Sequence, residues 1–115
     1  MKTLSNQVTL IGNLGKDVDV KTFSESKKVA NIPLATNYYY KNAKGEKVKE
    51  TQWHNLVLWG NLADIAKQIS HKGDQVMVQG RLTYRQYEDA QGQKQKVTEI
   101  LVSEFMKLSK KAQAA

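Results

Sequence analysis

The chain has 115 residues, a length that fits one domain, and its 40% hydrophobic and 25% charged residues exclude the composition of a disordered protein. Cysteine is absent, which excludes disulfides and thiolate metal sites, and no apolar run approaches the roughly 20 residues that span a bilayer. Eighteen Lys and Arg against eleven Asp and Glu give a net charge of +7, which is compatible with a polyanionic partner but not specific for one.

Five β-strands and one helix are expected along the chain. Short runs of β-branched and aromatic residues, bounded by turn residues, predict the strands. Between the third and fourth strands, four apolar residues recur with the spacing of a helix that buries one face. Asn61 is expected to cap this helix, with Asp64 bonding back to its start, and Gly73 is expected to end it. The expected strands are residues 8–12, 29–40, 53–60, 75–87 and 94–105, and the apolar helical positions are Leu62, Ile65, Ala66 and Ile69.

Two segments between the strands are strongly polar. Residues 41–50 carry four lysines and two glutamates and almost nothing apolar, which predicts a long, mobile, basic loop. Residues 88–93 are expected to form the hairpin turn that joins the last two strands. The sequence has no internal repeat and no interdomain linker, so we expect one domain over residues 1–106 and a short, flexible, basic tail over residues 107–115.

The order of the expected elements is β-β-β-α-β-β. This order is typical of the OB-fold, an all-β, five-stranded Greek-key barrel with one helix between strands 3 and 4. Closure of the sheet would also remove exposed strand edges from a short chain. A fold alone does not give a function, so the function must be argued from the side chains that the barrel presents.

Alternation along the third strand predicts where its side chains point, because successive residues of a strand face opposite sides. His54, Leu56 and Leu58 are expected to face the barrel interior. Both tryptophans of the chain then lie on the outer face, on either side of a polar residue. The outer set is Trp53, Asn55, Val57 and Trp59.

Two indoles outside a barrel need a reason, because burying an indole stabilises a fold by a few kcal/mol. The functional interpretation is a platform on which unpaired bases stack, at roughly 1–3 kcal/mol per base. The alternative is that a subunit interface or a loop covers the two rings.

The fourth strand repeats the pattern. Leu82 and Tyr84 share a face with the apolar Val76 and Val78, and the opposite face holds both arginines of the chain together with an aromatic residue. Guanidinium groups bind phosphate and stack on rings, which suits a strand that lies along a polyanion. A solvated polar face is the alternative. The opposite set is Arg81, Thr83, Arg85 and Tyr87.

Three adjacent tyrosines, Tyr38, Tyr39 and Tyr40, end the second strand, and at least one of them must be exposed. Parity counted from Ile32 and Leu34 turns Tyr38 and Tyr40 inward, whereas a bulge near residues 36–37 would reverse this assignment. The pattern alone leaves both arrangements open.

Catalytic and metal-binding motifs are not found. The two histidines, His54 and His71, lack the spacing of a metal site, and no nucleophile lies in a recognisable elbow. The segment Gly12-Asn13-Leu14-Gly15 is too short for a phosphate-binding loop and precedes no helix. We therefore expect no enzymatic activity, no cofactor and no bound metal.

Four short segments are each weakly informative but specific in their order and spacing. They are Gly12-Asn13-Leu14-Gly15-x-Asp17, Val29-Ala30-Asn31-Ile32-x-Leu34-Ala35-Thr36, Thr51-x-Trp53-His54 with Gly60-x-Leu62-Ala63, and Lys72-Gly73-x-x-Val76. With these segments the chain resembles the bacterial single-stranded DNA-binding protein family over most of its length, from residue 6 to about residue 102.

The resemblance implies an OB-fold that assembles as a homotetramer and binds single-stranded DNA without sequence preference. It implies that His54 lies in a subunit interface rather than on DNA, and it favours Tyr40 among the three tyrosines. Two of the stacking positions are Tyr where the family more often has Trp, which should weaken stacking. The implied stacking residues are Tyr40, Trp53, Trp59 and Tyr87, with Lys49, Lys72 and Arg85 beside them, and the strand pattern adds Arg81.

The expected function is therefore non-catalytic: binding and protection of single-stranded DNA in replication, repair and recombination, with the basic loop of residues 41–50 closing over the strand. A bacterial cytoplasmic, nucleoid-associated location is expected, since the N-terminus lacks a targeting pattern. The alternatives are an OB-fold accessory or scaffold subunit of a primosome, whose exposed rings contact protein, and RNA binding.

The sequence departs from the family pattern at its C-terminal end. Family members usually end in a long linker and an acidic tip that recruits replication and repair proteins, whereas this sequence ends in Lys110, Lys111 and a short Ala/Gln stretch. The two interpretations are a tailless paralogue and a gene in which the tail never existed. Replication and repair proteins remain candidate partners, but recruitment through an acidic tip is not among the expectations.

Overall fold

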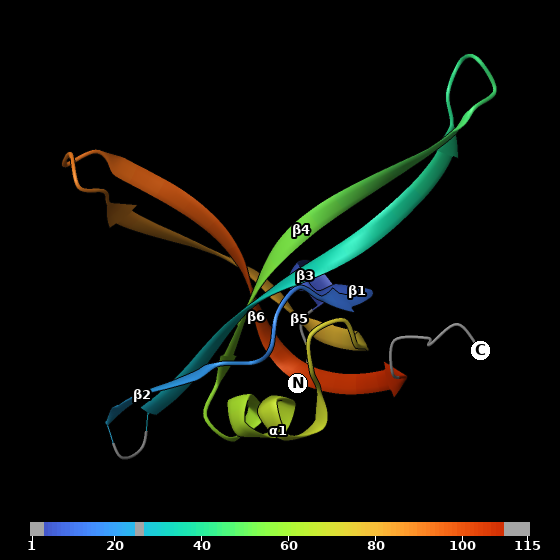
Figure 1. Ribbon diagram of the computed structural model, residues 1–115. Coiled ribbons are helices and arrows are strands. Elements are labelled where there is room, and N and C mark those ends of the chain that lie inside the picture. The colour runs from blue at the N-terminus through green and yellow to red at the C-terminus, as the bar shows by residue number, and fades with distance from the viewer. Residues whose placement is uncertain (1–3, 25–26, 110–115) are drawn as a thin grey trace.

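The computed structural model describes residues 4–24 and 27–109 of the chain. Strands form most of the described chain, as expected, with a single α-helix and one short 3-10 turn (Figure 1). The elements are η1 Leu4–Asn6, β1 Val8–Leu14, β2 Val20–Ser24, β3 Lys27–Lys41, β4 Lys47–Trp59, α1 Asn61–Ile69, β5 Gln75–Glu88 and β6 Lys94–Ser109.

Five of the strands close into a barrel in the order β1-β5-β6-β4-β3. Closure comes from a short pairing of β1 with β3, in which Asn13 lies opposite Ala35 and Leu14 opposite Leu34. The strands β4 and β6 are parallel, and the other neighbours are antiparallel. The predicted five-stranded OB-type barrel, with its helix between the third and fourth barrel strands, is confirmed.

The short strand β2 was not predicted. It pairs with the beginning of β3, where Val20 lies opposite Ala30 and Lys21 lies opposite Val29. The pairing becomes irregular between Thr22 and Ser24. Four of its five side chains are exposed, so it is held by backbone pairing rather than by a buried face. Without an apolar alternation, such a strand leaves no periodic signal in the sequence.

The barrel core consists of alternating residues from the paired strands. Leu56 and Leu58 are fully buried, as their alternation predicted. Burial of an aliphatic side chain contributes about 1.5–3 kcal/mol, so this interior face fixes the register of the whole barrel. The largest fully buried apolar side chains are Ile32, Leu34, Leu56, Leu58, Val76 and Val78.

The helix α1 packs against the barrel with a face that only partly overlaps the predicted one, since it includes Leu62 and Ala66. Ala63 and Ala66 are completely buried, whereas Ile65 and Ile69 are 46% and 37% exposed. Small side chains let the helix backbone approach the barrel closely, and the isoleucines then lie beside the contact rather than inside it. The predicted buried positions Ile65 and Ile69 were therefore wrong, and only part of the expected apolar face is covered.

Both ends of α1 also differ from the prediction. Gly60 is the N-cap, with a φ of 66° that favours glycine, and no side chain caps the helix. Asp64 does not bond back to Asn61, because its carboxylate accepts a hydrogen bond of 2.7 Å from Lys28 on β3. The helix ends at Ile69 with the extended residue Ser70 as its C-cap, before the expected stop.

Residues 41–50 are a hairpin rather than a long, mobile loop, so that prediction was wrong. The strands β3 and β4 pair without interruption from Val29 opposite Trp59 to Lys41 opposite Lys47. The turn is tight because the Oδ1 atom of Asn42 accepts hydrogen bonds from two backbone N–H groups, those of Lys44 and Glu46. Polar strands far from the core lack the apolar pattern that would have revealed them.

Two long hairpins extend from the barrel in different directions (Figure 1). We call the end of β3 and the start of β4 the first arm, residues 36–52, and the end of β5 and the start of β6 the second arm, residues 83–99. The strands of the second arm end where Glu88 pairs with Lys94. The predicted turn over residues 88–93 is therefore confirmed, except that Glu88 is the last residue of β5. Beyond the arms, β6 continues through Ser109, so residues 107–109 belong to a strand, and the rest of the expected tail, 110–115, lies outside the described residues.

Candidate nucleic-acid interface

The outer face of β4 carries both tryptophans. Trp53 is 62% exposed and Trp59 is 49% exposed, as the alternation predicted. Asn55 is exposed between them, but Val57 is buried. Val57 lies opposite Asn31 on β3 and beside Leu101 on β6, so neighbouring strands cover it. The outer face therefore presents two separate indoles with a polar gap between them.

The indole of Trp53 lies against a glycine. A Cβ atom added to Gly15 would lie 2.6 Å from Cζ3 of Trp53 and 3.1 Å from Cγ of Pro33. Only glycine lets the ring approach the backbone this closely. The ring is thus positioned by the barrel wall while most of its surface stays open to solvent.

The second arm presents arginine and tyrosine on its outer face. Arg85 donates to both carboxylate oxygens of Glu99, at 3.3 Å and 2.9 Å, and its guanidinium lies 5.8 Å from the ring centroid of Tyr87. Hydrogen bonding to Glu99 raises the pKa of Arg85. Tyr87 is 45% exposed, and Arg81 is exposed nearer the barrel.

Tyr84 is 67% exposed, although its parity with Val76 and Val78 predicted an inward position. The parity itself is unbroken along β5, since the irregular pairing near Gln79 arises from an extra residue on β6. The reason is that the second arm has left the barrel at this point, so neither of its faces has a core to contact.

All three tyrosines of the first arm are exposed. The pairing of β3 with β4 shows no bulge, so Tyr38 and Tyr40 share one side of the arm with His54. Their rings form a pair with centroids 5.9 Å apart. Tyr39 lies on the other side, the side of Trp53. The bulge alternative was therefore wrong, and the inward alternative was also wrong, because the arm has no interior.

The predicted basic residues lie in two different places. Lys49 is exposed and pairs with Tyr39, so it lies on the Trp53 side of the first arm. Lys72 is exposed in the turn between α1 and β5, where its backbone N–H donates to Asp17. Lys49 is thus brought to the side of the tryptophans, whereas Lys72 is not on a strand of that face.

His54 points away from the tryptophans, as predicted. Its Nε2 atom is hydrogen bonded to Oγ1 of Thr36 at 2.9 Å, and it lies opposite Leu34 near the end of the barrel. Partial burial lowers the pKa of His54 below its usual value of 6.5. The neutral ring is therefore favoured at neutral pH.

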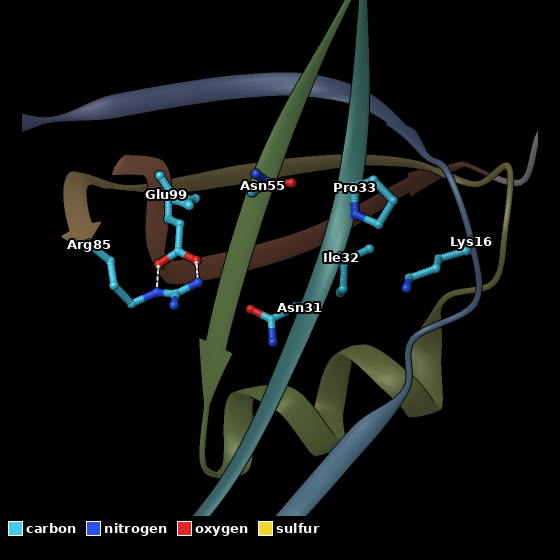
Figure 2. A pocket seen from close by; sticks show the side chains of 8 residues that line it. Lys16, Asn31, Ile32, Pro33, Asn55, Arg85 and Glu99 are labelled. Carbon is cyan, nitrogen blue, oxygen red and sulfur yellow. Dashed lines mark hydrogen bonds and ion pairs between the residues drawn. The ribbon is translucent and has the colours of Figure 1, made fainter. Parts of the chain in front are cut away.

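A pocket of about 370 Å³ is lined by Asn55, the outer-face residue of β4 between Trp53 and Trp59, although neither tryptophan itself lines it (Figure 2). Its wall combines carboxamides, one lysine and the Arg85–Glu99 pair with apolar surface. Four of the lining residues were not predicted to bind a ligand: Lys16, Asn31, Asn55 and Glu99. The strand alternation places Asn31 and Asn55 outside, but the cross-strand register that brings them together is not visible in the sequence. The lining residues are Lys16, Asn31, Ile32, Pro33, Asn55, Arg85, Val97 and Glu99.

Two kinds of feature are absent from the described residues. Residues 4–24 and 27–109 contain no group of three or more His, Asp or Glu side chains that could hold a metal ion. No α-helix in the same part of the chain is long and apolar enough to cross a membrane.

Comparison with known families identifies the chain. The model of the single-strand binding protein family matches residues 5–108, which include every strand of the barrel except the last residue of β6. The chain belongs to this family. The resemblance inferred from the four sequence segments is confirmed, and membership in a family of binding proteins confirms the expectation that the chain is not an enzyme.

Two members of the single-strand binding family show how far the similarity extends. Single-stranded DNA-binding protein 1 of Chlorobaculum tepidum is 39% identical over 107 residues, and the match covers 92% of this chain. The chain spans only 66% of the length of that relative. The Plasmodium falciparum SSB, solved in complex with single-stranded DNA, superimposes with a TM-score of 0.82 at 32% identity, covering 95% of this chain and 98% of that one.

Proposed function

We propose that this chain binds single-stranded DNA without sequence preference and protects it during replication, repair and recombination, without changing it chemically. The observation that carries the proposal is the exposure of both indoles on one face of β4, opposite a fully buried leucine face. Bases stack on Tyr40, Trp53, Trp59 and Tyr87, and phosphates are neutralised by Lys49, Lys72, Arg81 and Arg85.

The energetics support stacking. Each base that stacks on an aromatic side chain contributes about 1–3 kcal/mol, and every base has a π-face, so stacking does not select a sequence. The net charge of +7 adds a salt-dependent attraction for phosphates. Family membership and the relative solved with single-stranded DNA support the same ligand.

Arg85 differs from the other proposed phosphate ligands, because it is already paired. Glu99 neutralises much of its charge and holds the guanidinium beside Tyr87. We assign Arg85 a weaker contribution to phosphate binding than Lys49 or Arg81, for which the described residues provide no ion-pair partner.

We also propose that the chain assembles as a homotetramer, with His54 in a subunit interface. Two surface features support self-association. Ile11, Met77 and Met106 are cross-strand neighbours on the outside of β1, β5 and β6, and the first and last are 50% and 59% exposed. Over residues 8–12, β1 pairs only with β5 within the described chain, so its other edge is open to another strand. Sedimentation of the free protein tests this: a tetramer is expected, and a monomer at micromolar concentration would contradict it.

Fluorescence titration with single-stranded and double-stranded oligonucleotides, at two salt concentrations, tests the proposed function. We expect a dT oligomer to quench tryptophan emission and to bind more weakly at the higher salt concentration. Preferential binding of the duplex, or no quenching by either ligand, would contradict the proposal. An assembly whose tryptophans are shielded before any nucleic acid is added would instead favour a scaffold subunit, and competition with rU oligomers ranks RNA against DNA.

A further inference from the structure

The pocket lined by Asn31 and Asn55 contains hydrogen-bonding groups that the fold does not use. We propose that it is a nucleobase-edge site, in which Asn31 and Asn55 hydrogen-bond to the edge of a base lying between those stacked on Trp53 and Trp59. This inference rests on the proposed binding of single-stranded DNA and specifies what occupies the space between the stacking rings.

The strand register brings the two asparagines together. Asn55 lies opposite Pro33, and Asn31 lies opposite Val57, so the two carboxamides are diagonal neighbours on the outer face of β3 and β4. Diagonal neighbours of this kind are within reach of long or polar side chains. Figure 2 shows both side chains at the pocket, between Lys16 and the Arg85–Glu99 pair.

The two carboxamides differ from most other asparagines of the chain. Asn6, Asn13, Asn37 and Asn42 all hydrogen-bond within the structure, to backbone or side-chain groups. The side chains of Asn31 and Asn55 have no hydrogen-bond partner among residues 4–24 and 27–109. They are exposed to the pocket with their donors and acceptors free, so they stabilise no turn or cap.

The charges of the pocket favour a base rather than a phosphate beside the asparagines. At one end Glu99, only 9% exposed, carries a carboxylate that already pairs with Arg85, and this negative charge disfavours a phosphate there. At the other end Lys16 has no ion-pair partner in the described part of the chain. The nucleotide is thereby oriented, with its phosphate toward Lys16 and its neutral base toward the asparagines.

The chemistry of the carboxamide is compatible with binding that does not select a sequence. Each asparagine offers two N–H donors and a carbonyl acceptor, and the group can turn over to exchange their positions. A pair of such groups can match a donor and an acceptor on the edge of any base. Pro33 and Val97 add apolar surface that tolerates a ring of either size.

The test compares Asn31→Ala, Asn55→Ala and the double variant with the unaltered protein. Asn61→Ala is the matched control, because Asn61 is an exposed asparagine at the start of α1, away from the pocket lining. Affinities are measured by anisotropy for a labelled dT oligomer and for an oligomer of the same length made of abasic sugar-phosphate units. Because a hydrogen bond contributes about 0.5–1.5 kcal/mol, we expect each variant to bind dT about 2- to 10-fold more weakly.

The abasic oligomer separates base contacts from other effects. The double variant should bind it as tightly as the unaltered protein does, and dA and dC oligomers should lose affinity in the same range as dT. Equal losses on dT and on the abasic oligomer, or full affinity of the double variant for dT, would overturn the inference. If Trp53→Ala and Trp59→Ala weaken binding but the asparagine variants do not, only this inference fails. If the unaltered protein does not bind dT at all, the proposed function fails with it.

Discussion

At the scale of single residues, two glycines control how closely other groups approach the barrel. At Gly15 an added Cβ atom would lie 2.6 Å from the Trp53 ring, at the tip of a side chain. At Gly12 it would collide with the carbonyl oxygen of Ala35, a backbone atom at the pairing that closes the barrel. A side chain can move aside more easily than a paired strand, so the same substitution has different consequences at the two positions.

We therefore predict that Gly15→Ala lowers affinity for a dT oligomer several-fold and leaves stability nearly unchanged, because the added Cβ atom would press on side-chain atoms, those of Trp53 and Pro33, and not on a backbone atom. Gly12→Ala should instead lower the free energy of unfolding by about 1–3 kcal/mol, since the backbone of β3 must shift. Urea unfolding and fluorescence titration of both variants measure the two effects. A large loss of stability in Gly15→Ala would show that the indole is not free to move.

The stacking role of the two indoles predicts the effect of removing them. Trp53→Ala and Trp59→Ala should each weaken binding of a dT oligomer by about 1–3 kcal/mol, because each removes one stacking surface. Tyr84→Ala is the matched control, since Tyr84 is 67% exposed but lies on the other side of the second arm. Normal affinity in either tryptophan variant, measured by anisotropy of a labelled oligomer, would contradict stacking at that ring.

His54 predicts a pH dependence of stability. Burial lowers its pKa below 6.5, so the folded state binds the proton less readily than the unfolded state. The contribution of neutral His54 to the free energy of unfolding is complete above the pKa that this residue has in the unfolded state. It is lost as the pH falls through the lower pKa that it has in the folded state. His54→Gln should therefore show a shallower decline in unfolding free energy than the unaltered protein between about pH 7 and about pH 5. Parallel declines in urea unfolding would exclude His54 as a source of the effect.

At the scale of elements, residue alternation was informative only where a strand contacts the core. It placed Leu56 and Leu58 inside and the indoles outside, because burial selects one face. It failed at Tyr38 and Tyr84, because both lie on arms that have left the barrel. It also failed at β2, which buries almost nothing. The sequence pattern does not mark the point at which a strand leaves its core, so it cannot assign faces beyond that point.

The pairing of β5 with β6 predicts that one carboxylate restrains DNA binding. Glu99→Gln keeps a hydrogen-bond acceptor for Arg85 but removes the charge that neutralises it. We expect tighter binding of a dT oligomer, and a plot of log K against log salt that is steeper by up to about 0.7. Glu104→Gln removes the same charge at the barrel end of β6 and is the control. Unchanged affinity in Glu99→Gln would show that Arg85 does not contact phosphate.

At the scale of the whole molecule, the site is assembled from strands that are distant in the sequence. The pocket combines the segment after β1 with residues of β3, β4, β5 and β6. The exposure of Trp53 and Trp59, which do not line the pocket, could be predicted, since it follows from the alternation of a single strand. The sequence does not predict that Lys16, Asn31 and Glu99 lie together, because their proximity depends on barrel closure and on the parallel pairing of β4 with β6.

The central claim is that bases cover the two indoles when DNA binds. The chain contains only two tryptophans, Trp53 and Trp59, so its tryptophan emission reports on this face alone. Collisional quenching by acrylamide, measured with the free protein and with protein saturated by a dT oligomer, tests the claim directly. We predict efficient quenching of the free protein and strong protection in the complex. Equal accessibility of the indoles with and without bound DNA would contradict the account.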